Sequence, residues 1–146
     1  MTSVLVLNGP NLGRLGTREP EIYGSQDLRA LETLLRESAP ADFTIDLRQT
    51  DSEAELIGWL HEAVDTSSPV ILNAGALTHY SYAVHDAVSL VTSAGGTVIE
   101  VHISNPHARE EFRHTSVISS VASGVIAGFG FDSYLLALTA IGRRSH

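Results

Sequence analysis

The chain has 146 residues, 43% of them hydrophobic, which is enough for one domain with a substantial core. Its 17 acidic and 9 basic residues give a net charge of −8, which argues against general binding to nucleic acid or anionic membranes. All nine basic residues are arginine and no cysteine is present. Schiff-base, P-loop-lysine, thiol and cysteine–metal chemistries are therefore excluded.

No run of about 18 apolar residues occurs, so no membrane span is expected. The sequence enters a strand pattern directly, without a basic-then-apolar leader. Together with the lack of cysteine, this predicts a cytoplasmic protein. No repeat or linker divides the sequence, and we expect a single domain over residues 1–146.

Strand and helix patterns alternate along the chain. Strands are predicted at Val4–Asn8, Phe43–Leu47, Pro69–Asn73, Thr97–His102 and Gly124–Ala127. Helices are predicted around Leu28–Leu35, Glu55–Val64, Ser81–Ser93 and Asp132–Ile141. Asp51 or Ser52 is the expected N-cap of the second helix, with Glu55 completing a capping-box pattern.

This alternation predicts an α/β fold: a flavodoxin-like, doubly wound, five-stranded parallel sheet with strand order 2-1-3-4-5. Such sheets bind ligands beyond the carboxyl ends of their strands, near the switch point between strands 1 and 3. The candidate loops are therefore those after Asn8, Asn73 and His102.

The loop after Asn8 is long for a connection, and its glycines suit a lid. It carries Asn11, Arg18 and Tyr23. A tyrosine acts as a general base near neutral pH when arginine charge lowers its pKa from about 10. The alternatives are a flexible surface loop, and a tyrosine ring that packs against the edge of the domain.

The loop after Asn73 runs into a helix, and its N–H groups favour an anion or a polar ligand. His79 and Asp86 are seven residues apart, so we expect both on one helical face. The alternative for His79 is a capping or surface role.

The third loop follows a strand that ends in Glu100-Val101-His102. Glu100 and His102 point to the same face, so the carboxylate can orient the imidazole as a general acid. The N–H groups of Ile103 and Ser104 are candidates to bind a carboxylate.

Arg109 and Arg113 lie four residues apart and are expected to share one face of a helical turn. The alternative is an exposed ion-pair face with Glu110 or Glu111. Metal catalysis is disfavoured because no HExxH motif is present. A dinucleotide site is disfavoured because NGPNLGRLG lacks the G-x-G-x-x-G spacing.

Several motifs, in register over nearly the whole chain, resemble the type II 3-dehydroquinate dehydratases, also called type II dehydroquinases. They read LNGPNLGRLGTREPEIYG, QTDSEAELIGWLHEA, ILNAGALTHYS, EVHISNPHAREEFRHTS and GVIAGFGFDSYLLAL. The resemblance implies a flavodoxin-like subunit without cofactor or metal, assembled as a dodecamer (a tetramer of trimers). It implies anti elimination of water from 3-dehydroquinate to 3-dehydroshikimate through an enolate, in aromatic amino-acid biosynthesis or in quinate breakdown.

The resemblance also implies roles for single residues. Tyr23 would remove the proton from C2, Arg18 would stabilise the tyrosinate, and Asn11 would hold a water against the enolate oxygen. His102, oriented by Glu100, would protonate the departing C1 hydroxyl. The substrate would be bound by Asn73 at its C1 substituents, by the Ile103 and Ser104 amides at its carboxylate, and by His79 and Arg113 at its ring hydroxyls. Asp86 would reach Arg113 of a neighbouring subunit, and Arg109 would lie near the lid.

The chain departs from the family pattern at Ala76, Tyr80, Tyr82 and Ser133, which bear on subunit packing or on the site wall. One rival hypothesis is a flavodoxin-like binding module that has lost turnover. Such a module would be expected to have lost Tyr23, Arg18 or His102, and all three are present. The other rival is a metal-dependent hydrolase.

Overall fold

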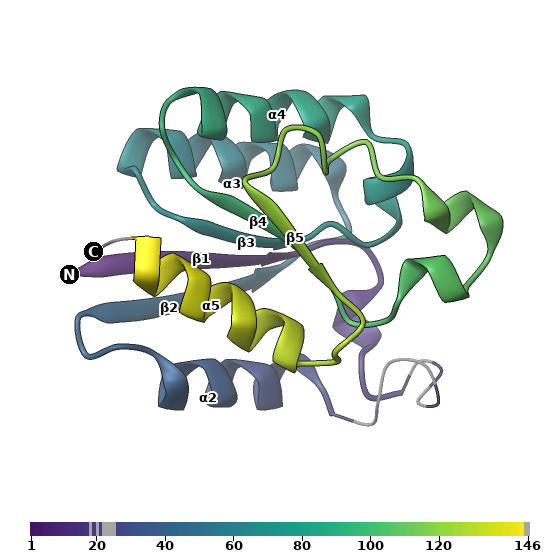
Figure 1. Ribbon diagram of the computed structural model, residues 1–146, viewed down its shortest axis with the longest axis horizontal. Coiled ribbons are helices and arrows are strands. Elements are labelled where there is room, and N and C mark those ends of the chain that lie inside the picture. The colour runs from purple at the N-terminus through teal and green to yellow at the C-terminus, as the bar shows by residue number, and fades with distance from the viewer. Residues whose placement is uncertain (18, 20, 22–25, 145–146) are drawn as a thin grey trace.

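The computed structural model describes residues 1–17, 19, 21 and 26–144. Its sheet has five parallel strands in the order β2-β1-β3-β4-β5, which confirms the predicted fold class and topology (Figure 1). The strands are β1 (Thr2–Asn8), β2 (Phe43–Gln49), β3 (Val70–Asn73), β4 (Val98–His102) and β5 (Gly124–Ala127). The α-helices of the described residues are α2 (Leu28–Ser38), α3 (Glu53–Thr66), α4 (Tyr82–Ser93) and α5 (Asp132–Arg144).

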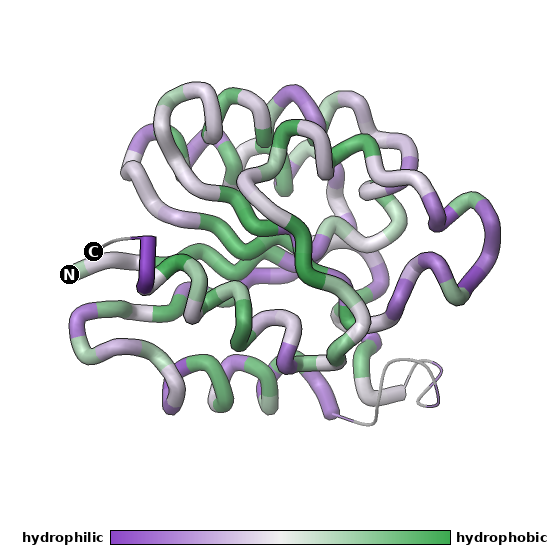
Figure 2. The backbone as a smooth tube through the Cα atoms, in the orientation of Figure 1, coloured by the Kyte–Doolittle hydropathy of each residue, from purple (hydrophilic) through white to green (hydrophobic). Residues whose placement is uncertain are grey.

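Strand β1 shows why the sheet needs a helical layer on each side. Val4 and Val6 join the core that packs under α2 and α5, whereas Leu5 and Leu7 join the core under α3 and α4. All four side chains are buried, because alternate residues of a strand point to opposite faces. Figure 1 shows the two helix pairs on the two faces, and Figure 2 shows the apolar strands between them.

The helices begin at polar side chains that satisfy free backbone N–H groups. The Ser52 Oγ accepts a hydrogen bond from the Glu55 N–H (3.1 Å), as the capping pattern predicts. In a full capping box the Glu55 side chain would accept from the Ser52 N–H. Here the Ser52 N–H donates to Thr50 Oγ1 instead (2.9 Å). Asp27 and Ser81 cap α2 and α4 in the same way.

The strand order places the carboxyl ends of β1, β3 and β4 next to one another at one edge of the sheet. After β1 the chain forms β2 at the edge of the sheet on one side of β1, and it then crosses over to form β3 on the other side of β1. Beyond this edge the described residues form four 3₁₀ helices: η1 (Leu12–Arg14), η2 (Gly75–His79), η3 (Pro106–Ala108) and η4 (Glu111–His114). The segment with η3 and η4 projects from the body of the molecule in Figure 1.

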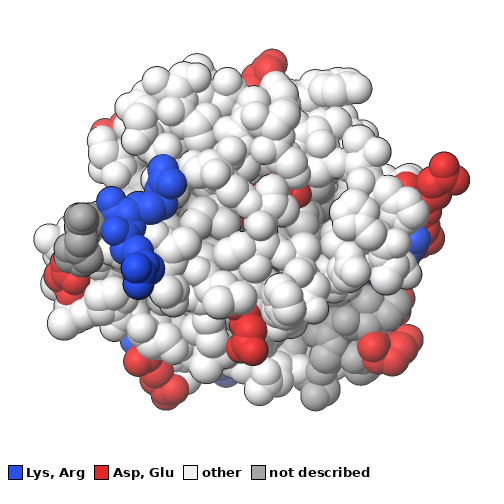
Figure 3. Space-filling view, in the orientation of Figure 1, with Lys and Arg blue, Asp and Glu red and all other residues white. Residues whose placement is uncertain are grey.

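The face of the molecule that carries β5 and α5 bears few charged side chains: arginines near the end of α5 form one cluster, and acidic side chains are scattered around the face (Figure 3). Val125, Phe129 and Leu136 of these elements and their connection are exposed. No helix formed by the described residues is both long and apolar enough to cross a membrane.

Candidate active site

A pocket of about 440 Å³, including its open mouth, lies at the carboxyl ends of β1, β3 and β4. Its lining comes from the three loops that the strand order predicts: Leu12 after β1, then Asn73, Gly75, Ala76 and His79 after β3, then His102, Ile103, Ser104, Pro106, Arg109 and Arg113 after β4.

The loops after β1 and β3 are pressed together beside this pocket. The Gly9 N–H donates to the Asn73 carbonyl (2.8 Å), and a Cβ on Gly9 would lie 2.5 Å from the Ala74 carbonyl oxygen. Gly75 has a φ of +60°, and its Cβ would lie 2.9 Å from the Pro10 carbonyl oxygen. Side chains at either glycine would force the loops apart.

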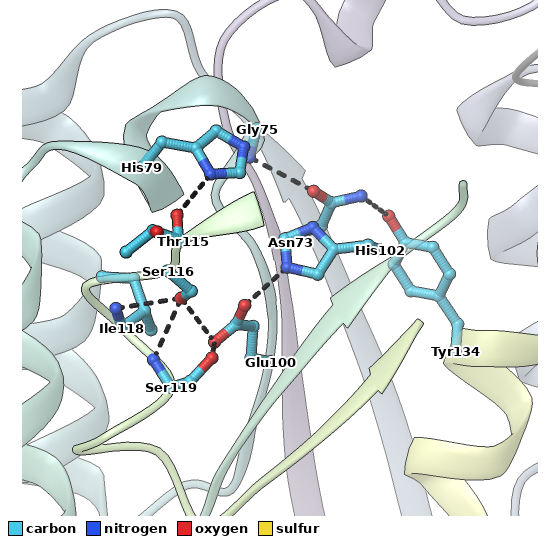
Figure 4. A network of polar contacts seen from close by, with 10 residues as sticks. All are labelled: Asn73, Gly75, His79, Glu100, His102, Thr115, Ser116, Ile118, Ser119 and Tyr134. Atoms are coloured by element: carbon cyan, nitrogen blue, oxygen red, sulfur yellow. Dashed lines mark hydrogen bonds and ion pairs between the residues drawn. The ribbon is translucent and has the colours of Figure 1, made fainter. Parts of the chain in front are cut away.

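His102 and Glu100 form a hydrogen-bonded pair at the end of β4. The His102 Nε2 lies 2.5 Å from Glu100 Oε2, and the two side chains are 11% and 2% exposed. The other carboxylate oxygen, Oε1, accepts hydrogen bonds from the hydroxyls of Ser116 (3.1 Å) and Ser119 (2.7 Å). Figure 4 shows the carboxylate between these serines and the imidazole, so Glu100 holds the ring of a pocket-lining histidine in one orientation.

Two opposing effects act on the Glu100 carboxyl group. Burial disfavours its ionised form, whereas hydrogen bonds from His102, Ser119 and Ser116 and the charge of His102 favour it. The second set prevails, and the pKa of Glu100 is lowered below its ordinary value. Glu100 is therefore an ionised, oriented partner for the imidazole at neutral pH.

His79 is the second histidine of the pocket, at the end of η2. Its Nδ1 lies 2.8 Å from the Thr115 carbonyl oxygen, which only accepts, so Nδ1 carries the proton. Burial, together with the charges of His102 and Arg113, lowers the pKa of His79, although the Thr115 hydrogen bond and Glu100 oppose this. The neutral ring leaves Nε2 as a hydrogen-bond acceptor, which suits a hydroxyl group.

Two largely buried arginines give the pocket positive charge in an acidic protein. The side chains of Arg109 and Arg113 are 13% and 16% exposed. Glu110 contacts both, at 3.7 Å from Arg109 Nη2 and 3.0 Å from Arg113 Nε. The expectation of one shared helical turn is wrong, because Arg109 follows the end of η3 as its C-cap residue and Arg113 lies in η4. Both nevertheless line the same pocket, and the alternative ion pair with Glu110 forms as well.

Ile103 and Ser104 lie just beyond the paired part of β4. The register with β3 ends at Glu100 and the register with β5 ends at His102. Both residues line the pocket, and the Ser104 hydroxyl accepts a hydrogen bond from Arg109 Nη1 (3.3 Å). Backbone amides beside an arginine suit a carboxylate ligand.

Asn73 ends β3 and is 4% exposed. Its Oδ1 accepts from the Gly75 N–H (3.2 Å), and its Nδ2 donates to the hydroxyl of Tyr134 (2.9 Å). Its amide is thereby fixed from both ends at the edge of the pocket (Figure 4).

Comparison with known proteins identifies this arrangement. The sequence model of the family described as "Dehydroquinase class II" matches residues 2–142. The chain belongs to the class II dehydroquinase family.

Individual relatives align with this chain over nearly its full length. A protein from Mycobacteroides abscessus named "3-dehydroquinate dehydratase" is 57% identical over 137 residues, which is 93% of each chain. One of the same name from Salinispora tropica is 52% identical over 143 residues, 97% of this chain and 98% of that one. The crystal structure of a type II dehydroquinase from Propionibacterium acnes superposes with a TM-score of 0.91 at 47% identity, covering 97% of this chain and 96% of that one.

The structure brings most of the predicted site residues together, but not all. Asn11 is exposed, has a φ of 70° and precedes η1, with its N–H bound to Asp51 Oδ1 (2.9 Å). Asp86 is exposed on α4, and the expected common helical face with His79 is wrong, because η2 ends at His79 and α4 begins only at Tyr82. Arg18 and Tyr23 lie outside the described residues.

The departures from the dehydroquinase pattern fall in different surroundings. Ala76 lines the pocket, whereas Tyr80 and Tyr82 are 62% and 72% exposed. Ser133 is fully buried, and its hydroxyl accepts from the Phe129 N–H (3.1 Å).

The sequence did not predict the residues that hold the site side chains in place through hydrogen bonds. Ser116 and Ser119 hold Glu100, and Tyr134 holds Asn73. The serines are 16 and 19 residues from Glu100, and no periodicity links them to it. Among the described residues, no group of three or more His, Asp or Glu side chains is arranged to hold a metal ion.

Proposed function

We propose residue roles and a mechanism for the 3-dehydroquinate dehydratase activity of this class II dehydroquinase, a hydro-lyase. The observation that carries the proposal is the Glu100–His102 pair in a pocket that also presents Asn73, His79 and two arginines. The reaction removes water from 3-dehydroquinate to give 3-dehydroshikimate. It belongs to the shikimate pathway, with quinate breakdown as the alternative use.

His102 is the general acid. Its Nε2 is held by Glu100, so Nδ1 is the ring nitrogen left to protonate the departing hydroxyl. The buried carboxylate stabilises the protonated ring before the transfer and holds its orientation throughout. The C1–O bond breaks as this proton is delivered, and water leaves.

Tyr23 is the general base, assisted by Arg18. The tyrosinate takes the proton from C2, next to the C3 ketone, and the C–H electron pair forms an enolate. These electrons then form the C1–C2 double bond as the hydroxyl departs. Asn11 holds a water against the enolate oxygen. These three assignments rest on the motif LNGPNLGRLGTREPEIYG.

The remaining pocket residues bind the substrate. The amides of Ile103 and Ser104 take the carboxylate, with Arg109 beside them. His79 accepts a ring hydroxyl at Nε2, and Arg113 donates to the same edge of the ring. Asn73 binds the C1 substituents, and no cofactor or metal takes part.

The subunits assemble as a dodecamer of four trimers, in which Asp86 of one subunit reaches Arg113 of its neighbour. The exposure of Asp86 supports this, because it is free to meet a second subunit. The exposed Tyr82 begins the same helix, the exposed Tyr80 lies two residues before it, and both supply apolar surface. The exposed apolar side chains around β5 offer a second contact area. We place the enzyme in the cytoplasm, in keeping with the absence of cysteine.

The test is turnover of 3-dehydroquinate by the purified chain, followed at the enone absorbance of the product with and without a chelator. We expect chelator-insensitive turnover that is strongly reduced in His102→Ala. Binding of 3-dehydroquinate by calorimetry without any absorbance change would instead favour the binding-module hypothesis. Loss of activity in chelator would favour the metal-dependent one.

A further inference from the structure

Tyr134 lies behind the pocket and contacts two strand ends at once. It comes from α5, an element that contributes none of the described residues lining the pocket, and it is completely buried. Its hydroxyl donates to Asn8 Oδ1 (2.7 Å) and accepts from Asn73 Nδ2 (2.9 Å). Asn8 and Asn73 are register partners at the carboxyl ends of β1 and β3.

The donor and acceptor roles in this group are determined from both ends. Asn8 Nδ2 donates to the Arg48 carbonyl oxygen (3.1 Å), so Asn8 Oδ1 faces Tyr134 and can only accept. The phenol must therefore donate to Asn8, and its oxygen is left to accept from Asn73. On the other side of Asn73, the Gly75 N–H donates a hydrogen bond to Asn73 Oδ1 (3.2 Å), which fixes Oδ1 as the atom that faces Gly75. The four hydrogen bonds that link Gly75, Asn73, Tyr134, Asn8 and Arg48 therefore all run from donor to acceptor in the same direction, toward the Arg48 carbonyl oxygen.

We propose that Tyr134 is a positioning residue for the dehydration: it fixes which way the Asn73 amide faces, and so which atoms Asn73 offers to the C1 substituents of the substrate. The proposal rests on the proposed role of Asn73. After the bonds to Tyr134 and Gly75, Asn73 retains one N–H and one lone pair. Their directions are set by a hydroxyl that never touches the substrate.

The burial of Tyr134 suits this role. Burial raises its pKa far above the usual range, against a smaller opposing effect of the Asn73 hydrogen bond, so the phenol stays protonated. Without the hydroxyl, Asn8 Oδ1 and Asn73 Nδ2 both lose a buried partner. Rotation of the Asn73 amide then competes with the productive orientation.

The test is Tyr134→Phe, which removes only the hydroxyl. We expect kcat for 3-dehydroquinate to fall about 5- to 50-fold, with KM changed less than about threefold. The matched control is Ser133→Ala, which removes an equally buried neighbouring hydroxyl that accepts from the Phe129 N–H instead. The control should retain kcat within about twofold, and thermal melting of each variant shows its effect on folding.

A double-mutant cycle separates action through Asn73 from a general loss of structure. In an Asn73→Ala background, adding Tyr134→Phe should lower kcat no further. An equal fall in both backgrounds, an equal fall in Ser133→Ala, or an unchanged kcat in Tyr134→Phe would each overturn the proposal. Failure of the wild-type chain to dehydrate 3-dehydroquinate would be a different result, because it would overturn the proposed function itself.

Discussion

Replacing Glu100 by Gln tests how much of the catalysis depends on one buried negative charge. The carboxylate accepts hydrogen bonds at both oxygens, from His102 at Oε2 and from Ser116 and Ser119 at Oε1. Glutamine has one acceptor oxygen and one donor group. If its oxygen faces the serines, its NH₂ faces the imidazole, and the protonated ring loses its acceptor.

The structure sets the size of the effect. The His102–Glu100 contact is 2.5 Å long and its two side chains are 11% and 2% exposed, so solvent screens it little. A charge-assisted hydrogen bond contributes about 1.5–3 kcal/mol, and about 1.4 kcal/mol corresponds to a tenfold change in rate. We therefore expect Glu100→Gln to lower kcat about 10- to 150-fold, with a smaller effect on KM.

The assay is kcat for 3-dehydroquinate between about pH 6 and 9, followed at the enone absorbance. His102→Ala gives the rate without the acid, and Glu100→Gln should retain more activity than that variant. Ser119→Ala removes one hydrogen bond of 2.7 Å to Oε1 and leaves His102 its acceptor, so it should lose only a few-fold. A Glu100→Gln enzyme with kcat within about twofold of wild type would refute the reasoning.

Further changes probe the base, the assembly, the fold and its response to acid. Tyr23→Phe should abolish turnover while product still binds; retention of more than about a tenth of the rate would place the base elsewhere. Asp86→Ala should weaken both activity and subunit contacts, and sedimentation of the wild type as a fully active monomer would contradict the assembly. Because the pKa of Glu100 is lowered from 4.5, the folded state should lose stability as pH falls below about that value, and denaturant titrations should show less of this loss in Glu100→Gln. Gly75→Ala should cost about 1–3 kcal/mol of unfolding free energy by strain and close contact with the Pro10 carbonyl, whereas Gly95→Ala, with positive φ and open space, should cost less.

The sequence predicted the sheet well because burial on both faces leaves long apolar runs. The predicted strand at Gly124–Ala127 has the observed bounds. The second strand extends beyond Leu47 to Gln49, because Arg48 and Gln49 continue the parallel register with β1 although they are polar. The hydrophobic pattern of the sequence does not indicate that polar residues pair with a neighbouring strand.

The site was predictable where its residues are close in the chain. The i, i+2 relation of Glu100 and His102 survives folding, since strand geometry fixes it. Helical spacing failed for Arg109 and Arg113, because the chain makes two separate 3₁₀ turns there. Contacts such as Asn73 with Tyr134, 61 residues apart, depend on how the helices dock and carry no local signal.

The Tyr134 contact has a consequence for biosynthesis on the ribosome. Asn8 is joined through it to a helix 126 residues further along the chain. β1, β3 and β4 can pair while the nascent chain is still growing, yet Asn73 acquires its fixed orientation only after α5 has emerged and docked. The sheet can therefore form before its catalytic edge is complete, and a polypeptide that lacked α5 would lack the contact that orients Asn73.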